Sequence, residues 1–95
     1  MAEKAFVLVA RVSTENARAV RSALNQLLPK GSVSSGDEGF LVKATMRGAD
    51  ARSLNRALLT ALRRVERRTR LRAEWTSGGT TERFFDYVPK GVRKA

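Results

Sequence analysis

Residues 49–68 read ADARSLNRALLTALRRVERR, and this stretch decides the fold. Its apolar side chains recur at steps of three and four residues, the spacing of one face of an α-helix. The stripe consists of Leu54, Leu58, Ala61, Leu62 and Val65. The spacing predicts a helix from Asp50 to Arg68, with Asp50 as its N-cap and with Arg67 and Arg68 in the last turn, where the helix dipole favours cations. On the opposite, outer face we expect Arg52, Arg56, Arg63 and Arg67.

Cations dominate the composition. The 95 residues include 19 Lys and Arg against 9 Asp and Glu, a formal net charge of +10. Between Arg47 and Arg72 nine arginines face two carboxylates, so this segment alone carries 9 − 2 = +7. Such a surplus repels itself unless a polyanion or solvent screens it, and arginine suits bidentate contact with phosphate. The pattern predicts a nucleic-acid site made by Arg52, Arg56, Arg63, Arg67, Arg68 and Arg70. The alternative is a solvated face that reflects composition alone.

Several classes of function lack the residues they need. The chain has no cysteine and no histidine, which excludes disulfides, zinc sites of the usual kind and a histidine general base. Ser13, Thr14 and Thr45 have no base to activate them, and Gly78-Gly79 lacks the pattern of a phosphate-binding loop. We therefore expect no catalytic residue, no metal and no cofactor. The longest apolar run, residues 5–10, is too short to span a bilayer, so a cytoplasmic protein is expected.

The segments around the arginine-rich stretch predict the rest of the fold. Alternation and β-branched residues indicate strands at 5–12, 32–36, 40–47 and 69–76, and a second amphipathic helix at 14–28 with Ser13 or Thr14 as its N-cap. This order predicts an α+β, ferredoxin-like two-layer sandwich whose first and third strands are central and whose helices cover one face. We expect residues 1–77 to form this domain and residues 78–95 a basic and aromatic C-terminal tail after a flexible glycine pair.

The predicted sandwich leaves one sheet face uncovered, and apolar side chains are expected on it. Val7, Val9 and Leu41 would lie together there as a dimer or partner surface. Leu59 is expected on the outer face of its helix, beside the arginines, where it suits a partner protein. The tail aromatics Phe84, Phe85 and Tyr87 either fold back onto the domain or dock on a partner, or the tail lies along RNA as a basic arm. The acidic pair Asp37-Glu38 is expected to face water in a hairpin turn.

Neither of two common RNA-binding modules fits the pattern. An RNA-recognition motif presents aromatic side chains on the exposed faces of its central strands, and none is expected there in this chain unless the two faces of the strands are reversed. A KH domain needs a GxxG loop between helices, whereas residues 36–39 lie in a predicted hairpin and include two acids. What remains is phosphate contact by arginines on the second helix.

Residues 40–63, FLVKATMRGADARSLNRALLTALR, resemble the small dimerising subunit of the KEOPS complex, which makes threonylcarbamoyladenosine in tRNA. The helix of those subunits typically reads Asp-x-x-Ala-Leu-Arg-x-x-x-Asn-Ser-x-Leu-Arg. Asp50, Ser53-Leu54, Thr60 and Leu62-Arg63 fall at matching or similar places, whereas Asn55 replaces an arginine and Leu59 an asparagine. The resemblance implies a non-catalytic subunit that dimerises through its sheet, holds the ATP-dependent threonylcarbamoyl transferase subunit through its helices and helps to grip tRNA.

The sequence thus predicts a non-catalytic, RNA-associated accessory subunit. It would self-associate as a homodimer, join a larger protein complex, and bind tRNA or another nucleic acid but no membrane. One alternative is a stand-alone basic nucleic-acid-binding protein associated with chromatin or ribosomes. Another is a protein-interaction module in which the arginines are incidental.

Overall fold

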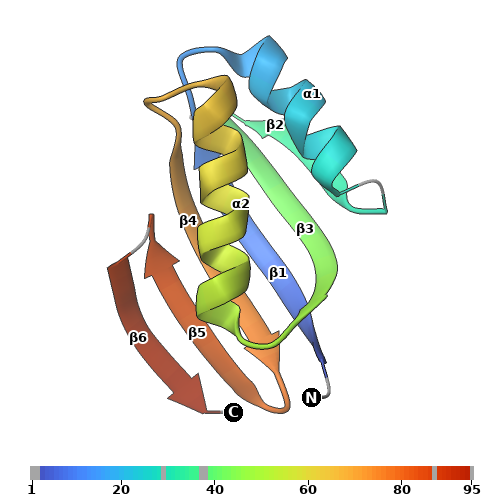
Figure 1. The fold of residues 1–95 in the computed structure, drawn as a ribbon, viewed down its shortest axis with the longest axis vertical. Coiled ribbons are helices and arrows are strands. Elements are labelled where there is room, and N and C mark those ends of the chain that lie inside the picture. Colours follow the sequence, from blue (N-terminus) through green and yellow to red (C-terminus); the bar gives the residue numbers. More distant parts are fainter. Residues whose placement is uncertain (1–2, 29, 37–38, 87, 95) are drawn as a thin grey trace.

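The computed structural model describes residues 3–28, 30–36, 39–86 and 88–94, with side chains as far as residue 86. Two helices and one antiparallel sheet make two layers, and both helices cover the same face of the sheet (Figure 1). The elements follow in the order β1 (Lys4–Ser13), α1 (Ala17–Leu27), β2 (Ser32–Gly36), β3 (Gly39–Gly48), α2 (Ala51–Val65), β4 (Arg70–Ser77), β5 (Thr80–Phe85) and β6 (Val88–Lys94). The predicted α+β class with two helices on one sheet face is therefore confirmed. Neither described helix has the length and apolar character needed to cross a membrane.

The sheet is wider than expected. Its order is β2-β3-β1-β4-β5-β6, so β1 and β3 are inner strands as predicted, but the sheet continues past β4. A four-stranded ferredoxin-like sheet is consequently not matched. The residues expected to form a tail supply β5 and β6 instead. The chain returns to β5 because Gly78 and Gly79 have φ angles of 58° and 78°, and positive φ at both central residues is the requirement of a two-residue type I′ hairpin turn.

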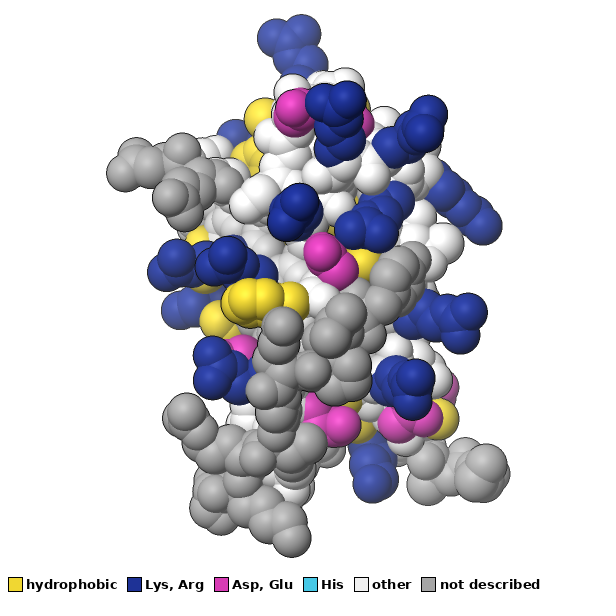
Figure 2. Space-filling model, turned by 90° about the vertical axis from the view of Figure 1, so that its left-hand side faces the viewer, with side chains coloured by type: hydrophobic (Ala, Val, Ile, Leu, Met, Phe, Trp, Pro, Cys, Tyr) yellow, Lys and Arg dark blue, Asp and Glu magenta, His cyan; other side chains and the backbone are white. Residues whose placement is uncertain are grey.

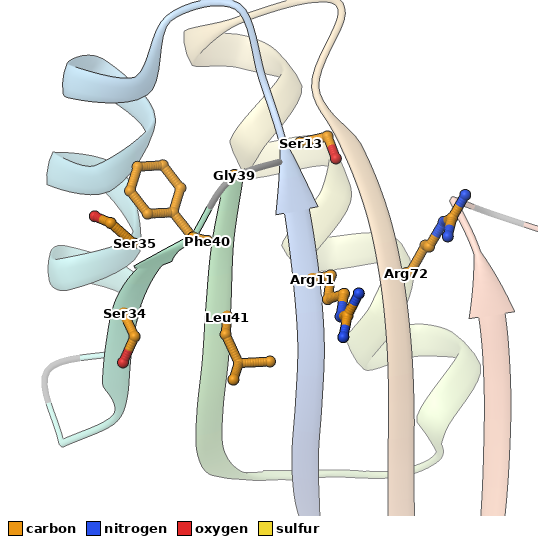
Figure 3. A pocket seen from close by; sticks show the side chains of 9 residues that line it. Arg11, Ser13, Ser34, Ser35, Gly39, Phe40, Leu41 and Arg72 are labelled. Carbon is orange, nitrogen blue, oxygen red and sulfur yellow. The ribbon is translucent and has the colours of Figure 1, made fainter.

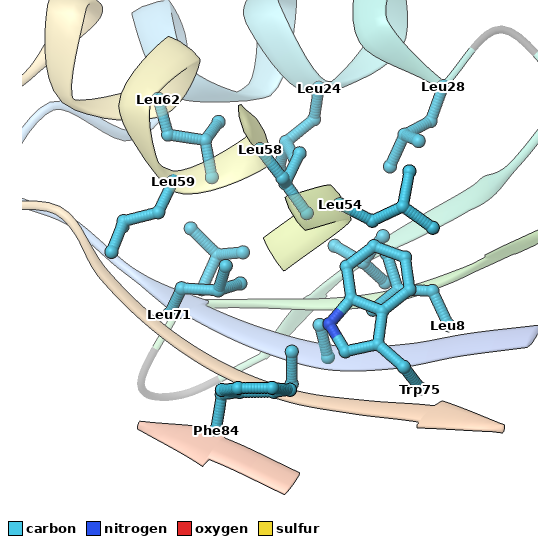
Figure 4. Packing of buried hydrophobic residues seen from close by; sticks show 14 of the residues in the cluster. Leu8, Leu24, Leu28, Leu54, Leu58, Leu59, Leu62, Leu71, Trp75 and Phe84 are labelled. Atoms are coloured by element: carbon cyan, nitrogen blue, oxygen red, sulfur yellow. The ribbon is translucent and has the colours of Figure 1, made fainter. Parts of the chain in front are cut away.

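The hydrophobic core lies between the sheet and the helices. Alternate residues of β1, from Phe6 to Val12, are buried beneath the helices, which is the period of two that a strand with one covered face requires. Trp75 on β4 is completely buried and packs among leucines of both helices and the sheet (Figure 4). Every buried polar side-chain atom of the described residues has a hydrogen-bond partner.

The N-cap of α1 is Asn16 rather than Ser13 or Thr14. The side-chain oxygen of Asn16 accepts a hydrogen bond from the backbone N–H of Ala19 at 3.3 Å. Thr14 lies two residues before this cap, and its hydroxyl oxygen accepts a hydrogen bond from the backbone N–H of Asn16 at 3.2 Å. The helix therefore begins at Ala17, three residues later than predicted.

The N-cap of α2 is Asp50, as predicted. Its Oδ1 accepts the backbone N–H of Ser53 at 2.7 Å, and this bond lowers the pKa of the carboxyl group. The other end differs from the prediction: α2 ends at Val65, and Glu66 is already extended. Arg67 and Arg68 thus lie beyond the helix, and Val65 is exposed rather than buried.

Leu59 corrects the predicted orientation of α2. It was expected on the outer face, yet it is fully buried. Figure 4 shows its side chain directed toward Leu71 on β4, with Phe84 of β5 below. The extra strand β5 extends the sheet under α2, so the helix buries a broader stripe than its leucine spacing indicated. That stripe is Ala51, Leu54, Asn55, Leu58, Leu59 and Leu62.

Candidate nucleic-acid interface

The arginines on α2 form a row along one flank of the helix. Arg52 and Arg56 are four residues apart, which places them on the same side, and both are exposed. Arg67 follows just beyond the helix and is also exposed. Among the residues that the structure describes, none of these three forms an ion pair. Their exposure agrees with the outer face that the sequence predicted, and it leaves their guanidinium groups accessible to solvent.

Arg63 differs from the rest of the row because the fold itself binds it. Its Nε donates to the backbone oxygen of Thr69 at 3.0 Å, and its Nη2 lies 3.5 Å from Oδ1 of Asp86. About a third of each charged side chain is exposed (34% and 30%). Through these two contacts Arg63 connects the end of α2 to the start of β4 and the end of β5. Arg63 is better placed to hold the sheet to the helix than to meet a ligand.

Arg68 also has a carboxylate partner, but a looser one. Its Nη1 lies 3.3 Å from Oε2 of Glu15, and the two side chains are 76% and 64% exposed. Exposed pairs of this kind contribute about 0–1 kcal/mol and are screened by salt. Phosphate can compete for Arg68, so it remains a candidate contact.

A buried polar network, which sequence reasoning missed, fixes the side of α2 that carries the arginines. The Nε1–H of Trp75 donates to Oδ1 of Asn55 at 3.2 Å, and Nδ2 of Asn55 donates to the backbone oxygen of Asp86 at 2.6 Å. Asp86 also accepts the N–H of Leu71 through Oδ1 at 2.9 Å and has a positive φ of 56°. The signal in the sequence was an asparagine directly after Leu54, at the edge of the predicted apolar stripe.

The described end of the sheet next to α2 is hollowed and cationic. The hollow has a volume of about 730 Å³. It is lined by Ser13, Thr14, Glu15, Arg63, Arg67, Arg68, Arg70 and Asp86. Both carboxylates in it already pair with arginines, through Asp86–Arg63 and Glu15–Arg68. Arg67 and Arg70 are left as exposed cations without an ion pair among the described residues.

The uncovered face of the sheet carries a second cationic surface. Strand register places its exposed charges on one side: Arg11, Lys43, Arg47, Arg70, Arg72, Glu74 and Arg83. Within β1 to β5, Glu74 is the only carboxylate of that face, and its Oε2 lies 3.4 Å from Nε of Arg83. Figure 2 views the sheet from its β6 side, and Lys and Arg side chains lie along both flanks of that view, the helix side and the uncovered side.

A second hollow, of about 470 Å³, lies on the uncovered face beside the β2–β3 hairpin. Figure 3 shows its lining, with Leu41, Arg11 and Arg72 on the successive strands β3, β1 and β4. Ser13 lines this hollow and also the hollow near α2, so the two adjoin at the end of β1. Cationic surface therefore continues from the uncovered face around the end of the sheet to the end of α2.

Apart from Leu59, which is buried, the predicted partner residues divide into three groups. Val7, Val9 and Leu41 are exposed by 52%, 38% and 38% and lie together on the uncovered face, where the sequence placed them. Phe84 is buried in the core, which agrees with the fold-back alternative, whereas Phe85 is 41% exposed and lies under the guanidinium group of Arg72. Tyr87 and the acidic pair Asp37-Glu38 lie outside the described residues.

The interface carries the chemistry of anion binding. Within the described parts of the chain, no group of three or more His, Cys, Asp or Glu residues could hold a metal ion. Guanidinium groups and hydroxyls instead line both hollows. Comparison with models of protein families, with curated proteins and with solved structures finds no match for this chain.

Proposed function

We propose that this chain is a non-catalytic, cytoplasmic, RNA-associated protein that binds RNA through arginines on α2 and at the end of the sheet. One observation carries the proposal: Arg52, Arg56 and Arg67 are exposed and have no ion pair among the described residues, in a chain of net charge +10. A phosphate backbone would relieve the mutual repulsion of these cations and release its own counterions. Binding of this kind depends steeply on salt and reads little sequence.

The form of the function that we favour is an accessory subunit of a tRNA-modifying complex. Its support is the resemblance of residues 40–63 to the KEOPS small subunit, together with the strand order β2-β3-β1-β4, which is that of a ferredoxin-like sandwich extended here by two strands. Self-association would use Val7, Val9 and Leu41 on the uncovered face. A stand-alone nucleic-acid-binding protein is the rival, since the same arginines serve it equally well.

A salt titration tests the proposal. We expect the purified chain to bind labelled tRNA at low salt and to lose affinity steeply as salt rises. Replacing Arg52 and Arg56 with Gln should weaken binding and reduce the salt slope by about one for each phosphate that the variant no longer neutralises. The matched control is Arg18→Gln with Arg21→Gln, which removes the same charge from exposed positions on α1. Absence of binding to tRNA at low salt would overturn the proposal.

The same titration separates the two forms. Equal binding to tRNA and duplex DNA without any protein partner favours the stand-alone protein. Weak binding to tRNA that tightens when a threonylcarbamoyl transferase subunit is added favours the accessory subunit. Light scattering during size-exclusion chromatography gives the oligomeric state, and a dimer that Val9→Lys dissociates would support self-association through the uncovered face.

A further inference from the structure

A row of exposed side chains crosses the uncovered face of the sheet at one level. Strand register pairs Leu41 on β3 with Arg11 on β1, Arg11 with Arg72 on β4, and Arg72 with Phe85 on β5. All four side chains are exposed and point away from the helices. Two apolar groups thus flank two guanidinium groups in the middle of the sheet.

The two arginines of this row are held side by side without local neutralisation. Directly opposite residues on antiparallel strands have Cβ atoms about 4.5–5.5 Å apart, and like charges at such positions destabilise the sheet. Glu74, which is diagonal to Arg11, already pairs with Arg83 at 3.4 Å. Neither Arg11 nor Arg72 has an ion pair among the described residues. An anion between them would turn this repulsion into two charge-assisted contacts.

Arg72 is also stacked. Its Cζ lies 4.6 Å from the centroid of the Phe85 ring, within the range of a cation–π contact. The contact restrains a planar guanidinium group on an exposed aromatic ring. Both ring and guanidinium planes are surfaces on which unpaired nucleic-acid bases stack, whereas bases in a duplex are already stacked on one another.

The hollow of about 470 Å³ adjoins this row and supplies polar groups beside it. Ser34 and Ser35 of β2 line it together with Arg11 and Arg72 (Figure 3). Serine hydroxyls and guanidinium groups are common partners of phosphate and sugar oxygens. The neighbouring groups thus suit a sugar–phosphate backbone next to a stacking surface.

We propose that this face is a binding platform for single-stranded RNA, with a backbone phosphate between Arg11 and Arg72 and a base stacked on the Arg72–Phe85 pair. The inference rests on the proposed function and adds to it a second site and a preferred ligand. A second copy of the chain docked through Val7 and Val9 would compete with RNA for this face, and it is the poorer occupant of the arginine row itself, because face-to-face contact would oppose two cationic surfaces. An acidic peptide would satisfy the charges but would leave the stacking surface unused.

The test compares two surfaces and several probes. The face variant is Arg11→Gln with Arg72→Gln, the helix variant is Arg52→Gln with Arg56→Gln, and the control is Arg18→Gln with Arg21→Gln. The probes are a labelled uridine decamer, an abasic decamer with the same phosphates, a short RNA duplex and a glutamate decamer. Tryptophan fluorescence and thermal unfolding confirm that each variant is folded.

We expect the wild-type chain to bind the uridine decamer more tightly than the abasic decamer, the duplex or the glutamate decamer. The face variant should lose about tenfold or more in affinity for the uridine decamer, with a salt slope lower by about 0.7 for each phosphate that it no longer neutralises. The control should change little. Phe85→Leu should weaken uridine binding about fivefold or more and leave abasic binding nearly unchanged, since the missing contribution is stacking. Arg11→Lys with Arg72→Lys should give an intermediate affinity, because charge is kept while the planar groups are removed.

Three results would overturn the inference. One is a face variant that binds the uridine decamer as tightly as the control does, even if the helix variant is weakened; the proposed function would then stand without this site. Another is binding of the uridine decamer no tighter than that of the abasic decamer, the duplex or the glutamate decamer. The third is no RNA binding by the wild-type chain at low salt, which would refute the platform and the proposed function together.

Discussion

Replacing Asn55 with alanine should destabilise the fold far more than an asparagine-to-alanine change normally does. Asn55 is 1% exposed, and its amide group joins Nε1 of Trp75, at 3.2 Å, to the backbone oxygen of Asp86, at 2.6 Å. Alanine would leave the buried indole N–H and that carbonyl without partners. A buried polar group left unsatisfied costs about 1–3 kcal/mol, and the better helix propensity of alanine returns about 0.7 kcal/mol or less. We expect a net loss of about 2–4 kcal/mol in the free energy of unfolding.

The measurement is urea and thermal unfolding followed by circular dichroism. For a chain of this length the loss corresponds to a fall of roughly 10–25 °C in Tm. Asn25→Ala is the matched control, because Asn25 is exposed on α1, and it should change stability by about 0.5 kcal/mol or less. In a Trp75→Phe background, Asn55→Ala should cost less, since the indole N–H is no longer present. A loss below about 0.5 kcal/mol for Asn55→Ala, or equal losses in both backgrounds, would refute this account of the network.

Three further predictions concern positions that the structure distinguishes. Arg63→Gln should lower the free energy of unfolding by about 1 kcal/mol, because it removes the contacts with Thr69 and Asp86. Arg56→Gln, the control, should change it by about 0.5 kcal/mol or less. Equal effects of the two substitutions would contradict the assigned role of Arg63. Gly39→Ala should prevent or severely weaken folding, since its Cβ would lie 2.0 Å from the backbone oxygen of Val12. Gly36→Ala is the control, because its Cβ would meet nothing closer than 3.7 Å. Circular dichroism compares the two variants, and a well-folded Gly39→Ala variant would contradict the register of β1 and β3. The pKa of Asp50 is lowered in the fold, so its charge stabilises the protein above the unfolded pKa of about 3.9, and this contribution is lost as pH falls through the lower folded pKa. Acid titration of stability should therefore be less steep below about pH 4 for Asp50→Asn than for the wild type, and identical curves would count against the assigned cap.

Local patterns predicted most of the elements, because their signals lie within a few residues of one another. The leucine spacing of α2 gives most of its covered face, and Asp50 marks the start of α2 through its side-chain oxygen. Helix ends were less accurate. Arg67 and Arg68 look like a last turn in sequence, yet the chain must leave the helix at Val65 to reach β4.

The sequence prediction underestimated the width of the sheet, because it did not include β5 and β6. Gly78-Gly79 was interpreted as a flexible break, although a glycine pair between two alternating segments is a strong hairpin signal. Because β5 was not predicted, the expected sheet was narrower than the sheet in the structure. Leu59 was therefore expected on the outer face of α2, although it is buried. The role of Asn55 was missed because its partners Trp75 and Asp86 are 20 and 31 residues away in the sequence.

The candidate site was predicted in part. Arginine spacing located the exposed α2 cations Arg52 and Arg56, but it could not reveal that Arg63 contacts Asp86, because that pairing requires the return of β5. The Arg11–Arg72 pair depends on the register between β1 and β4, whose residues are separated by some 60 positions in the chain. No periodicity within one segment contains that information.

The position of β1 has a consequence for how the chain folds. Val7 pairs on one side with Thr45 and on the other with Thr76, so β1, which precedes the other strands of the described sheet in sequence, has both of its neighbours far downstream. Closing such long loops slows folding relative to helical proteins of similar size. During translation the apolar residues 5–10 therefore stay unpaired until β3 emerges, and they lack their second neighbour until β4 follows. Nascent chains stalled before residue 70 should be the ones that need a chaperone.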